Sequence, residues 1–161
     1  MMQLYLIRHG IAGERAEYAT DAERPLTEAG RKKTRRVAER LLACDLRLEL
    51  VLTSPLLRAR QTADILQAVG LAAQVQEFAA LAPGGELQTW LDWRDRHPLA
   101  SVAVVGHQPD LGQWATQVGS GARDDQLVVK KAGVIGIELP PSGSPLGASE
   151  LFLLTAPRWL L

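Results

Sequence analysis

The chain has 161 residues, of which 47% are hydrophobic and 22% are charged, so it is long enough to bury the core of one domain. Lysine and arginine together number 18, and so do aspartate and glutamate. No net positive charge is therefore available to collect nucleic acid or an anionic membrane surface. Cys44 is the sole cysteine, which excludes an internal disulfide and a cysteine-based metal cluster and fits a reducing cytoplasm.

The first predicted strand covers residues 3–7, which are mostly apolar. This run is too short to span a membrane and has no basic leader, so we expect no signal peptide, no membrane anchor and a cytoplasmic location. Arg8, His9 and Gly10 follow at once. Ligands of open α/β sheets bind at the carboxyl ends of strands, and glycine lets the backbone approach a bound group closely. The tripeptide therefore predicts a reactive imidazole at a strand end.

A helix over residues 27–43 leads to a second buried strand over residues 50–53. Serine is a common helix N-cap and proline is common at the first position of a helix, so Ser54 and the proline after it predict a helix start. We therefore expect a helix over residues 55–69. Arg58 falls in its opening turn, close to the carboxyl end of the preceding strand.

The segment between residues 70 and 101 predicts one helix, over residues 86–96, and leaves little room for a lid. His97 follows this helix, where a histidine commonly serves as a favourable positive charge. We prefer that role to a zinc site built from His9, His97 and His107. The basic side chains of the first helix are expected to form a solvated face, and the tryptophans to pack in or near the core. These tryptophans are Trp90, Trp93, Trp114 and Trp159.

A third strand is predicted over residues 102–105, followed by Gly106, His107 and a helix over residues 109–118. His107 thus occupies the same kind of place as His9, at the carboxyl end of a buried strand.

The alternation of strands and helices predicts an α/β fold with a largely parallel sheet covered by helices. Near the C-terminus, strands over residues 134–139 and 151–155 are separated by a short segment rich in proline, glycine and serine. So short a link predicts an antiparallel hairpin at the edge of the sheet. The sequence has neither a repeat nor an interdomain linker, and we expect one domain over residues 1–161.

Histidine and arginine side chains from the three strand ends are expected to converge above one sheet edge. They suit a phosphoryl group, because a guanidinium binds two phosphate oxygens at once and helix N-termini add amide donors. His9 can act as a nucleophile near neutral pH if its other ring nitrogen donates a hydrogen bond that fixes the tautomer. The sequence therefore predicts phosphoryl transfer through a histidine, with no metal or other cofactor.

Three segments resemble the motifs of the histidine phosphatase superfamily, also called phosphoglycerate mutase-like. They are residues 6–10, 54–63 and 105–109, and residues 24–30 are similar to a fourth. The resemblance covers about residues 3–120, and the short chain narrows it to the SixA-type phosphohistidine phosphatases. It implies a three-layer α/β/α fold with a mostly parallel sheet and an antiparallel C-terminal edge.

The resemblance also implies roles for single residues. His9 would be the nucleophile that becomes transiently phosphorylated. Arg24 would lie near the substrate entrance, unless it anchors the helix that follows. The phosphate pocket would be completed by Arg8, Gly10, Arg58 and His107.

The leaving-group acid is left open. Many members of the superfamily place a glutamate where this chain has Ala79 and Ala80. Asp21 resembles an acid of the short phosphohistidine enzymes, whereas Glu77 and Glu86 are alternatives that fit surface carboxylates better. An imidazole departs readily near neutral pH, but an alkoxide needs a positioned proton donor.

The expected substrate is therefore a histidine-phosphorylated protein of the phosphorelay or phosphocarrier type. One alternative is a phosphatase of small phosphate monoesters such as sugar phosphates. Another is a non-catalytic module that binds phosphoryl groups, against which the intact nucleophile argues. The oligomeric state does not follow from the sequence, and we expect a monomer that binds neither nucleic acid nor membranes.

Overall fold

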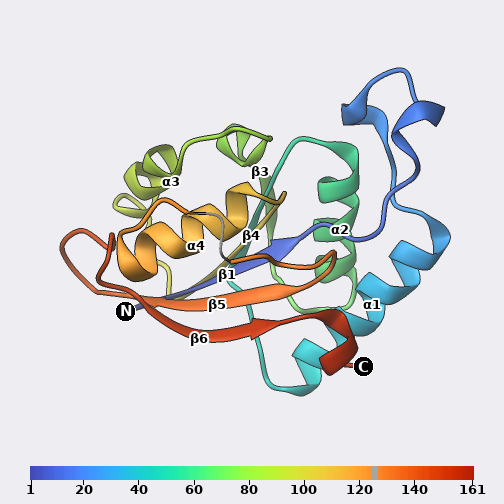
Figure 1. The fold of residues 1–161 in the computed structure, drawn as a ribbon. Helices are drawn as coiled ribbons and strands as arrows, with labels where there is room; N and C mark the ends of the chain where they lie inside the picture. Colours follow the sequence, from blue (N-terminus) through green and yellow to red (C-terminus); the bar gives the residue numbers. More distant parts are fainter. Residues whose placement is uncertain (125–126) are drawn as a thin grey trace.

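The computed structural model describes residues 1–124 and 127–161 (Figure 1). A six-stranded sheet has the order β3-β2-β4-β1-β5-β6. Its strands are β1 (Met2–Arg8), β2 (Leu50–Thr53), β3 (Val75–Glu77), β4 (Ser101–Gly106), β5 (Val134–Leu139) and β6 (Glu150–Thr155). The first four strands pair in parallel, and β5 and β6 add an antiparallel edge.

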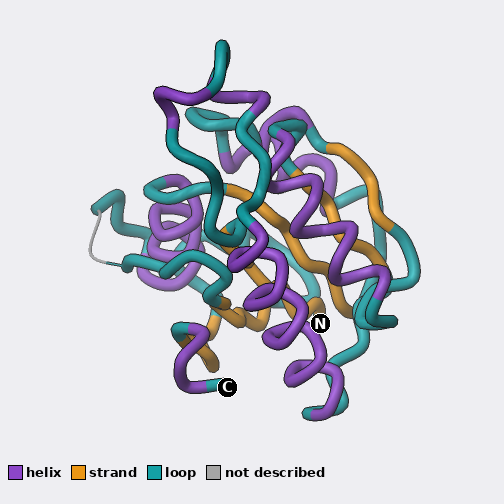
Figure 2. Tube along the Cα trace, turned by 90° about the vertical axis from the view of Figure 1, so that its right-hand side faces the viewer, coloured by secondary structure: helices purple, strands orange, loops and turns teal. Residues whose placement is uncertain are grey.

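Helices cover both faces of the sheet, as the trace in Figure 2 shows. They are α1 (Glu28–Ala43), α2 (Leu57–Ala68), α3 (Leu87–Arg94) and α4 (Asp110–Ser120). Side chains alternate along β1, so that Leu4 and Leu6 pack with α3 and α4, whereas Tyr5 and Ile7 pack with α1 and α2. The expected three-layer α/β/α architecture is thereby confirmed. No helix among the described residues is both long and apolar enough to cross a membrane.

Most of the predicted elements are present within a few residues of their expected bounds, but β3 and the short 3-10 turns were missed. These turns are Arg15–Glu17, Asp21–Glu23, Ala79–Leu81 and Pro157–Trp159. The three residues of β3 include a single apolar side chain, that of Val75, and the strand lies at the outer edge of the sheet. A strand that buries so little has no clear hydrophobic period, so pattern alone could not reveal it.

The predicted start of α2 was wrong. The helix begins at Leu57, with Leu56 rather than Ser54 in the N-cap position. Ser54 is fully buried, and its Oγ accepts a hydrogen bond from the Leu56 backbone amide at 3.2 Å. Its hydroxyl therefore serves the turn before the helix instead of the helix itself.

Three of the four tryptophans are buried as expected, namely Trp90, Trp93 and Trp114, but Trp159 is 73% exposed. Trp159 ends a short 3-10 turn after β6, beyond the helices that cover the sheet, and it contacts the guanidinium of Arg158. His97 donates from Nδ1 to the Trp93 carbonyl oxygen at 2.6 Å and stacks on the Trp93 ring. This contact near the end of α3 agrees with the structural role expected for His97.

The chain after β1 passes tightly against α1, and two glycines allow this approach. A Cβ atom on Gly30 would lie 2.1 Å from the Ile11 carbonyl oxygen, and one on Gly10 would lie 2.4 Å from Thr34 Oγ1. Thr27 caps α1 by accepting from the Gly30 amide, and its own amide donates to Ile11. The N-terminus of α1 thus supports the loop that leaves the end of β1.

Replacing Gly30 with alanine should lower the free energy of unfolding by about 1–3 kcal/mol, because backbone must move to admit the methyl group. The matched control is Gly119→Ala in α4, where an added Cβ meets nothing within 4 Å. This control should raise the free energy of unfolding by up to about 1 kcal/mol through helix propensity. Urea unfolding of both variants measures the difference, and a Gly30→Ala protein as stable as the wild type would contradict the close approach.

Candidate active site

Parallel strand pairing brings the two histidines together. Arg8 at the end of β1 pairs with Gly106 at the end of β4, and the His9 amide donates to the Gly106 carbonyl oxygen at 3.1 Å. The ring centroids of His9 and His107 are 5.2 Å apart. β2 ends beside β4, and α2 then carries Arg58 to the same edge, where its Nε donates to His9 Nε2 at 3.2 Å.

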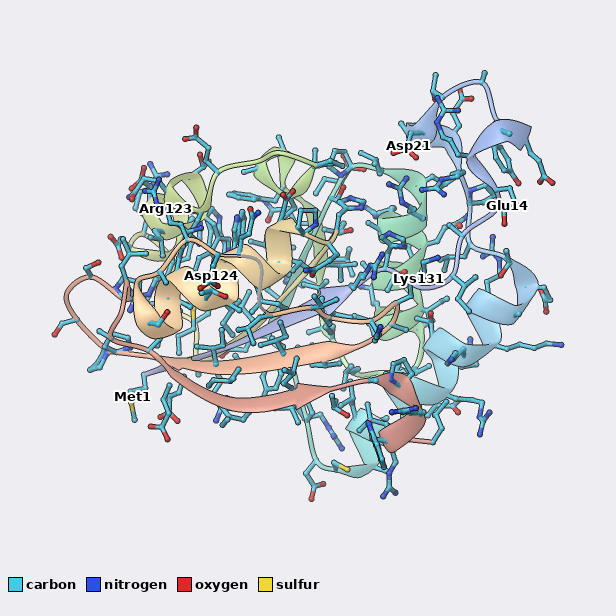
Figure 3. All side chains as sticks on the ribbon, viewed as in Figure 1. Met1, Glu14, Asp21, Arg123, Asp124 and Lys131 are labelled. Atoms are coloured by element: carbon cyan, nitrogen blue, oxygen red, sulfur yellow. The ribbon has the colours of Figure 1, made fainter. Side chains whose placement is uncertain are left out.

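A cleft of about 470 Å³ opens at this edge. The residues that the resemblance assigns to the phosphate pocket and Asp21 all line it, except Gly10, which is buried. Figure 3 labels Asp21 and Lys131, both at the end of the molecule toward which β1 points. The complete lining is Arg8, His9, Ala12, Asp21, Arg24, Arg58, Pro83, Gly84, His107, Gln108, Pro109, Asp110 and Lys131.

The orientation of His9 follows from one short contact. His9 Nδ1 lies 2.7 Å from the Gly10 carbonyl oxygen. Because a carbonyl can only accept, Nδ1 carries the proton and Nε2 holds the lone pair. The Gly10 amide in turn donates to Thr62 Oγ1 at 3.1 Å. Gly10 therefore fixes the tautomer of His9, and the Nε2 lone pair, which accepts from Arg58 Nε, belongs to a ring that lines the cleft.

Burial keeps both histidines neutral. Loss of hydration, reinforced by the charges of Arg58 and Arg8, lowers the pKa of His9 to about 3, although its hydrogen bond to Gly10 acts in the opposite direction. Burial and then Arg58 lower the pKa of His107 to about 4, against a smaller opposing influence from Asp21. At neutral pH the positive charge of the cleft therefore resides on its arginine and lysine side chains rather than on histidine, and His9 retains its lone pair.

His107 is oriented by Ser54, whose Oγ lies 2.8 Å from His107 Nε2. Ser54 Oγ also accepts from the Leu56 amide, so this hydroxyl links the His107 ring to the turn before α2. The other ring nitrogen, His107 Nδ1, is buried and has no hydrogen-bond partner among the described residues.

Two arginine donors, Nε of Arg8 and Nε of Arg24, are also buried and have no acceptor among the described residues. Buried donors without an acceptor cost stability. The three residues that carry these unpartnered nitrogens line one cleft, which is therefore well suited to bind the oxygens of an anion. They are Arg8, Arg24 and His107.

Asp21 holds the arginines of the cleft in place. Its carboxylate accepts from Arg58 Nη2 at 3.0 Å and pairs with Arg24 Nη2 at 3.1 Å, and its backbone carbonyl accepts from Arg58 Nη1 at 2.9 Å. Burial, the largest single influence, would raise the pKa of Asp21, but the hydrogen bond and charge of Arg58, with those of Arg24 and Arg15, lower it overall. The Asp21 carboxyl is therefore ionised in the free protein.

The two alternative carboxylates lie elsewhere. Glu77 Oε1 is 3.8 Å from Arg60 Nη1, on the outer side of α2, and Glu86 lines a different cleft. Arg24 lines the active-site cleft, and its Nη1 donates to the Gly13 carbonyl oxygen at 3.3 Å, in the loop after β1 rather than in the helix α1 that follows Arg24.

Sequence reasoning missed Lys131 and Asp110. Lys131 arrives from a loop distant in sequence, which is fixed where the Ala132 amide donates to the carbonyl oxygens of Arg8 and His9. Ala132 adopts a φ of 60°, a left-handed conformation uncommon for a residue with a side chain. No local pattern marks such a contact. Asp110 could have been found, because it begins the helix directly after the segment that contains His107.

Comparison with protein families matches residues 4–110 to the model of the histidine phosphatase superfamily, branch 1. An uncharacterised protein of Picosynechococcus is 49% identical over 164 residues, which cover 99% of both chains. The phosphohistidine phosphatase SixA of Escherichia coli is 29% identical over 147 residues, which cover 89% of both chains.

Solved structures show the same architecture. The protein histidine phosphatase SixA complexed with tungstate has a TM-score of 0.86 at 27% identity, covering 99% of this chain and 100% of that one. A phosphoserine phosphatase from Entamoeba histolytica in complex with phosphoserine has a TM-score of 0.73 at 15% identity over 100% of both chains, which is a likeness of fold alone. The expected phosphoglycerate mutase-like fold is confirmed.

The lowered pKa values of His9 and His107 predict that both imidazoles stay neutral from pH 8 to about pH 5. In the unfolded chain they take up protons below about pH 6.5. The two rings therefore leave the free energy of unfolding independent of pH above about pH 6.5, lower it as the pH falls from 6.5 toward 4 and 3, and lower it no further below that. Nitrogen-15 NMR titration, with assignments from His9→Ala and His107→Ala, measures the ring pKa values. A His9 ring that titrates near pH 6.5 would contradict its neutral, buried state.

Proposed function

The chain belongs to the histidine phosphatase superfamily, and from that premise we propose that it is a phosphohistidine phosphatase whose nucleophile is His9. The observation that carries this proposal is the His9 Nε2 lone pair, fixed by the Gly10 carbonyl on a ring that lines a cleft with buried, unpartnered nitrogens. The proposed substrate is a histidine-phosphorylated protein of the phosphorelay or phosphocarrier type.

The reaction proceeds in two displacements. His9 Nε2 attacks the phosphorus, a bond from Nε2 to phosphorus forms, and the bond from phosphorus to the substrate imidazole breaks, with its electron pair passing to that imidazole. A water molecule then attacks the phosphorus of phosphorylated His9, which releases inorganic phosphate and restores the neutral ring. Arg58 must release His9 Nε2 as the phosphoryl group enters, and its guanidinium then binds the phosphoryl oxygens.

The remaining donors stabilise the charge on the transferring group. Arg8, Arg24 and His107 line the cleft, and each has a buried side-chain nitrogen with no partner among the described residues. Donors that are held in place lower the barrier because they need not reorient when the charge develops. The arginines and Lys131 supply the positive charge, and the proposed reaction includes no metal or other cofactor.

The state of Asp21 favours an imidazole leaving group. An ionised carboxylate paired with Arg58 and Arg24 has no proton to give to an alkoxide. The conjugate acid of imidazole has a pKa of about 6.5, so phosphohistidine needs less assistance than a sugar phosphate. We assign to Asp21, a carboxylate of the cleft lining, the role of orienting Arg58 through their ion pair.

The comparisons support this substrate class at a coarser level. A relative that covers 89% of this chain is a phosphohistidine phosphatase, and a SixA structure of high similarity holds tungstate, a tetrahedral oxyanion like phosphate. The phosphoserine phosphatase shares only the fold, so it gives the small-monoester alternative no support beyond that likeness. A module that merely binds phosphoryl groups has no need of an oriented nucleophile. We further propose that the enzyme acts as a cytoplasmic monomer.

A phosphate-release panel tests the substrate class. Phosphohistidine protein prepared with phosphoramidate should be hydrolysed with a higher kcat/KM than sugar or aryl phosphates, and a chelator should leave its rate unchanged. A higher efficiency on a sugar phosphate would favour the small-monoester alternative, and binding without turnover would favour the non-catalytic module. Loss of activity with chelator that a divalent ion restores would contradict the proposed chemistry.

Arg58→Ala and His107→Ala should each lower kcat by about two to three orders of magnitude, the effect of losing one preorganised donor to a developing charge. Arg60→Ala is the matched control, because Arg60 lies on the same helix but pairs with Asp64 on its outer surface. Steady-state kinetics on phosphohistidine protein measure all three. Equal losses of kcat in Arg58→Ala and Arg60→Ala would contradict a role for Arg58 in binding the phosphoryl group.

A further inference from the structure

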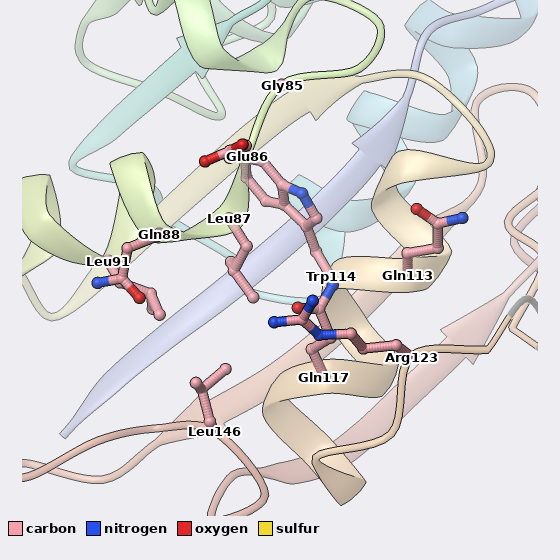
Figure 4. A pocket seen from close by; sticks show the side chains of 10 residues that line it. All are labelled: Gly85, Glu86, Leu87, Gln88, Leu91, Gln113, Trp114, Gln117, Arg123 and Leu146. Atoms are coloured by element: carbon pink, nitrogen blue, oxygen red, sulfur yellow. The ribbon is translucent and has the colours of Figure 1, made fainter.

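A second cleft of about 510 Å³ lies between α3 and α4 (Figure 4). Leu87, Leu91 and Trp114 provide its apolar lining, and these three side chains are almost entirely buried. Glu86, Arg123 and the 43% exposed Leu146 stand around it. None of the proposed chemistry uses these residues.

This cleft adjoins the active-site cleft along two segments of the chain. Asp110 begins α4 and lines the active-site cleft, whereas Gln113 and Gln117, on the same face of α4, line the second cleft. Gly84 likewise lines the active-site cleft, and Gly85 lines the second one. The Gly84 amide donates to Asp110 Oδ2 at 2.8 Å, so this hydrogen bond joins the two segments where the clefts adjoin.

The spacing of the clefts matches a short stretch of polypeptide. Asp110 and Gln117 are seven residues apart on α4, which corresponds to about 10 Å along the helix axis. An extended chain covers about 3.3 Å per residue, so about three residues span that distance. A protein whose phosphohistidine occupies the active-site cleft can therefore place a neighbouring residue in the second cleft, whereas free phosphohistidine and sugar phosphates are too short to reach it.

The lining also has the chemistry that a peptide requires. The carboxamide of Gln117 can donate and accept hydrogen bonds, as the amides and carbonyls of a main chain do. Leucine and tryptophan side chains offer contact to one apolar side chain. The rim carries one positive side chain, Arg123, and one negative side chain, Glu86, so it does not select an occupant of one charge.

We propose that the second cleft is the docking site for the polypeptide of the phosphoprotein substrate and that it receives an apolar side chain about three residues from the phosphohistidine. This inference rests on the proposed function, because it concerns the protein part of the same substrate. It makes the second cleft the part of the enzyme that distinguishes a phosphoprotein from small phosphorylated molecules.

Synthetic heptapeptides with a central phosphohistidine test the docking site. One series carries leucine three residues before or after the phosphohistidine, a second has glycine at both positions, and free phosphohistidine is the reference. The wild type should hydrolyse one leucine peptide with a kcat/KM about tenfold above that for free phosphohistidine, the gain expected from burying one leucine side chain. The glycine peptide should show less of this gain.

Two variants should remove the gain and leave hydrolysis of free phosphohistidine unchanged. Leu146→Asp places a carboxylate at the exposed rim, and Gln117→Trp fills the cleft from α4. Leu154→Asp is the matched control, because Leu154 is a similarly exposed leucine on the distant strand β6, and this variant should retain the gain.

Each outcome separates docking from catalysis. Equal kcat/KM values for free phosphohistidine and all peptides would overturn the docking site while leaving the proposed function intact. Variants that slow peptides and free phosphohistidine by the same factor would also overturn it. Failure of the wild type to hydrolyse free phosphohistidine and every phosphohistidine peptide would overturn the proposed function, and the docking site with it.

Discussion

The chemistry of the site depends on the hydrogen bond from His9 Nδ1 to the Gly10 carbonyl oxygen, which leaves the lone pair on Nε2. The fold holds this bond from two sides. The N-terminal turn of α1 packs against the loop that follows Gly10, at a distance that only glycine permits at position 30. On the other side, Thr62 Oγ1 accepts from the Gly10 amide and donates to the Arg58 carbonyl oxygen, so one hydroxyl ties the nucleophile loop to α2.

The same packing sets the charges. Burial keeps His9 and His107 neutral, which preserves a nucleophile but leaves the positive charge of the cleft to arginine and Lys131. Arg58 is buried too, and its pKa is lowered by burial but supported by Asp21. Asp21 therefore has a structural reason to be ionised: it offsets the cost of holding guanidinium groups beside a neutral imidazole. An acid that serves this purpose is poorly placed to protonate an alkoxide, and this agrees with phosphohistidine as substrate.

Much of this site was predictable from sequence, because His9, Arg58 and His107 each follow a buried run of hydrophobic residues, and parallel strands end at one edge. Long-range contacts were not predictable. Lys131 lies at the cleft because the amide of its neighbour Ala132 is hydrogen-bonded to the backbone after β1. Ser54 was predicted to cap a helix, but its hydroxyl is hydrogen-bonded to His107. The short edge strand β3 and the exposed Trp159 show the same limit at the margins of the sheet, where local pattern does not reveal what covers a side chain.

The central claim is that His9 carries the phosphoryl group during turnover. Rapid-quench mixing of the enzyme with radiolabelled phosphohistidine protein, followed by mass spectrometry of the labelled peptide, measures this directly. We expect label on His9 of the wild type, labile to acid and stable to alkali, and no label on the His9→Ala variant, which should also lack turnover. Acid-stable label, label on another residue, or substantial turnover by His9→Ala would contradict the account.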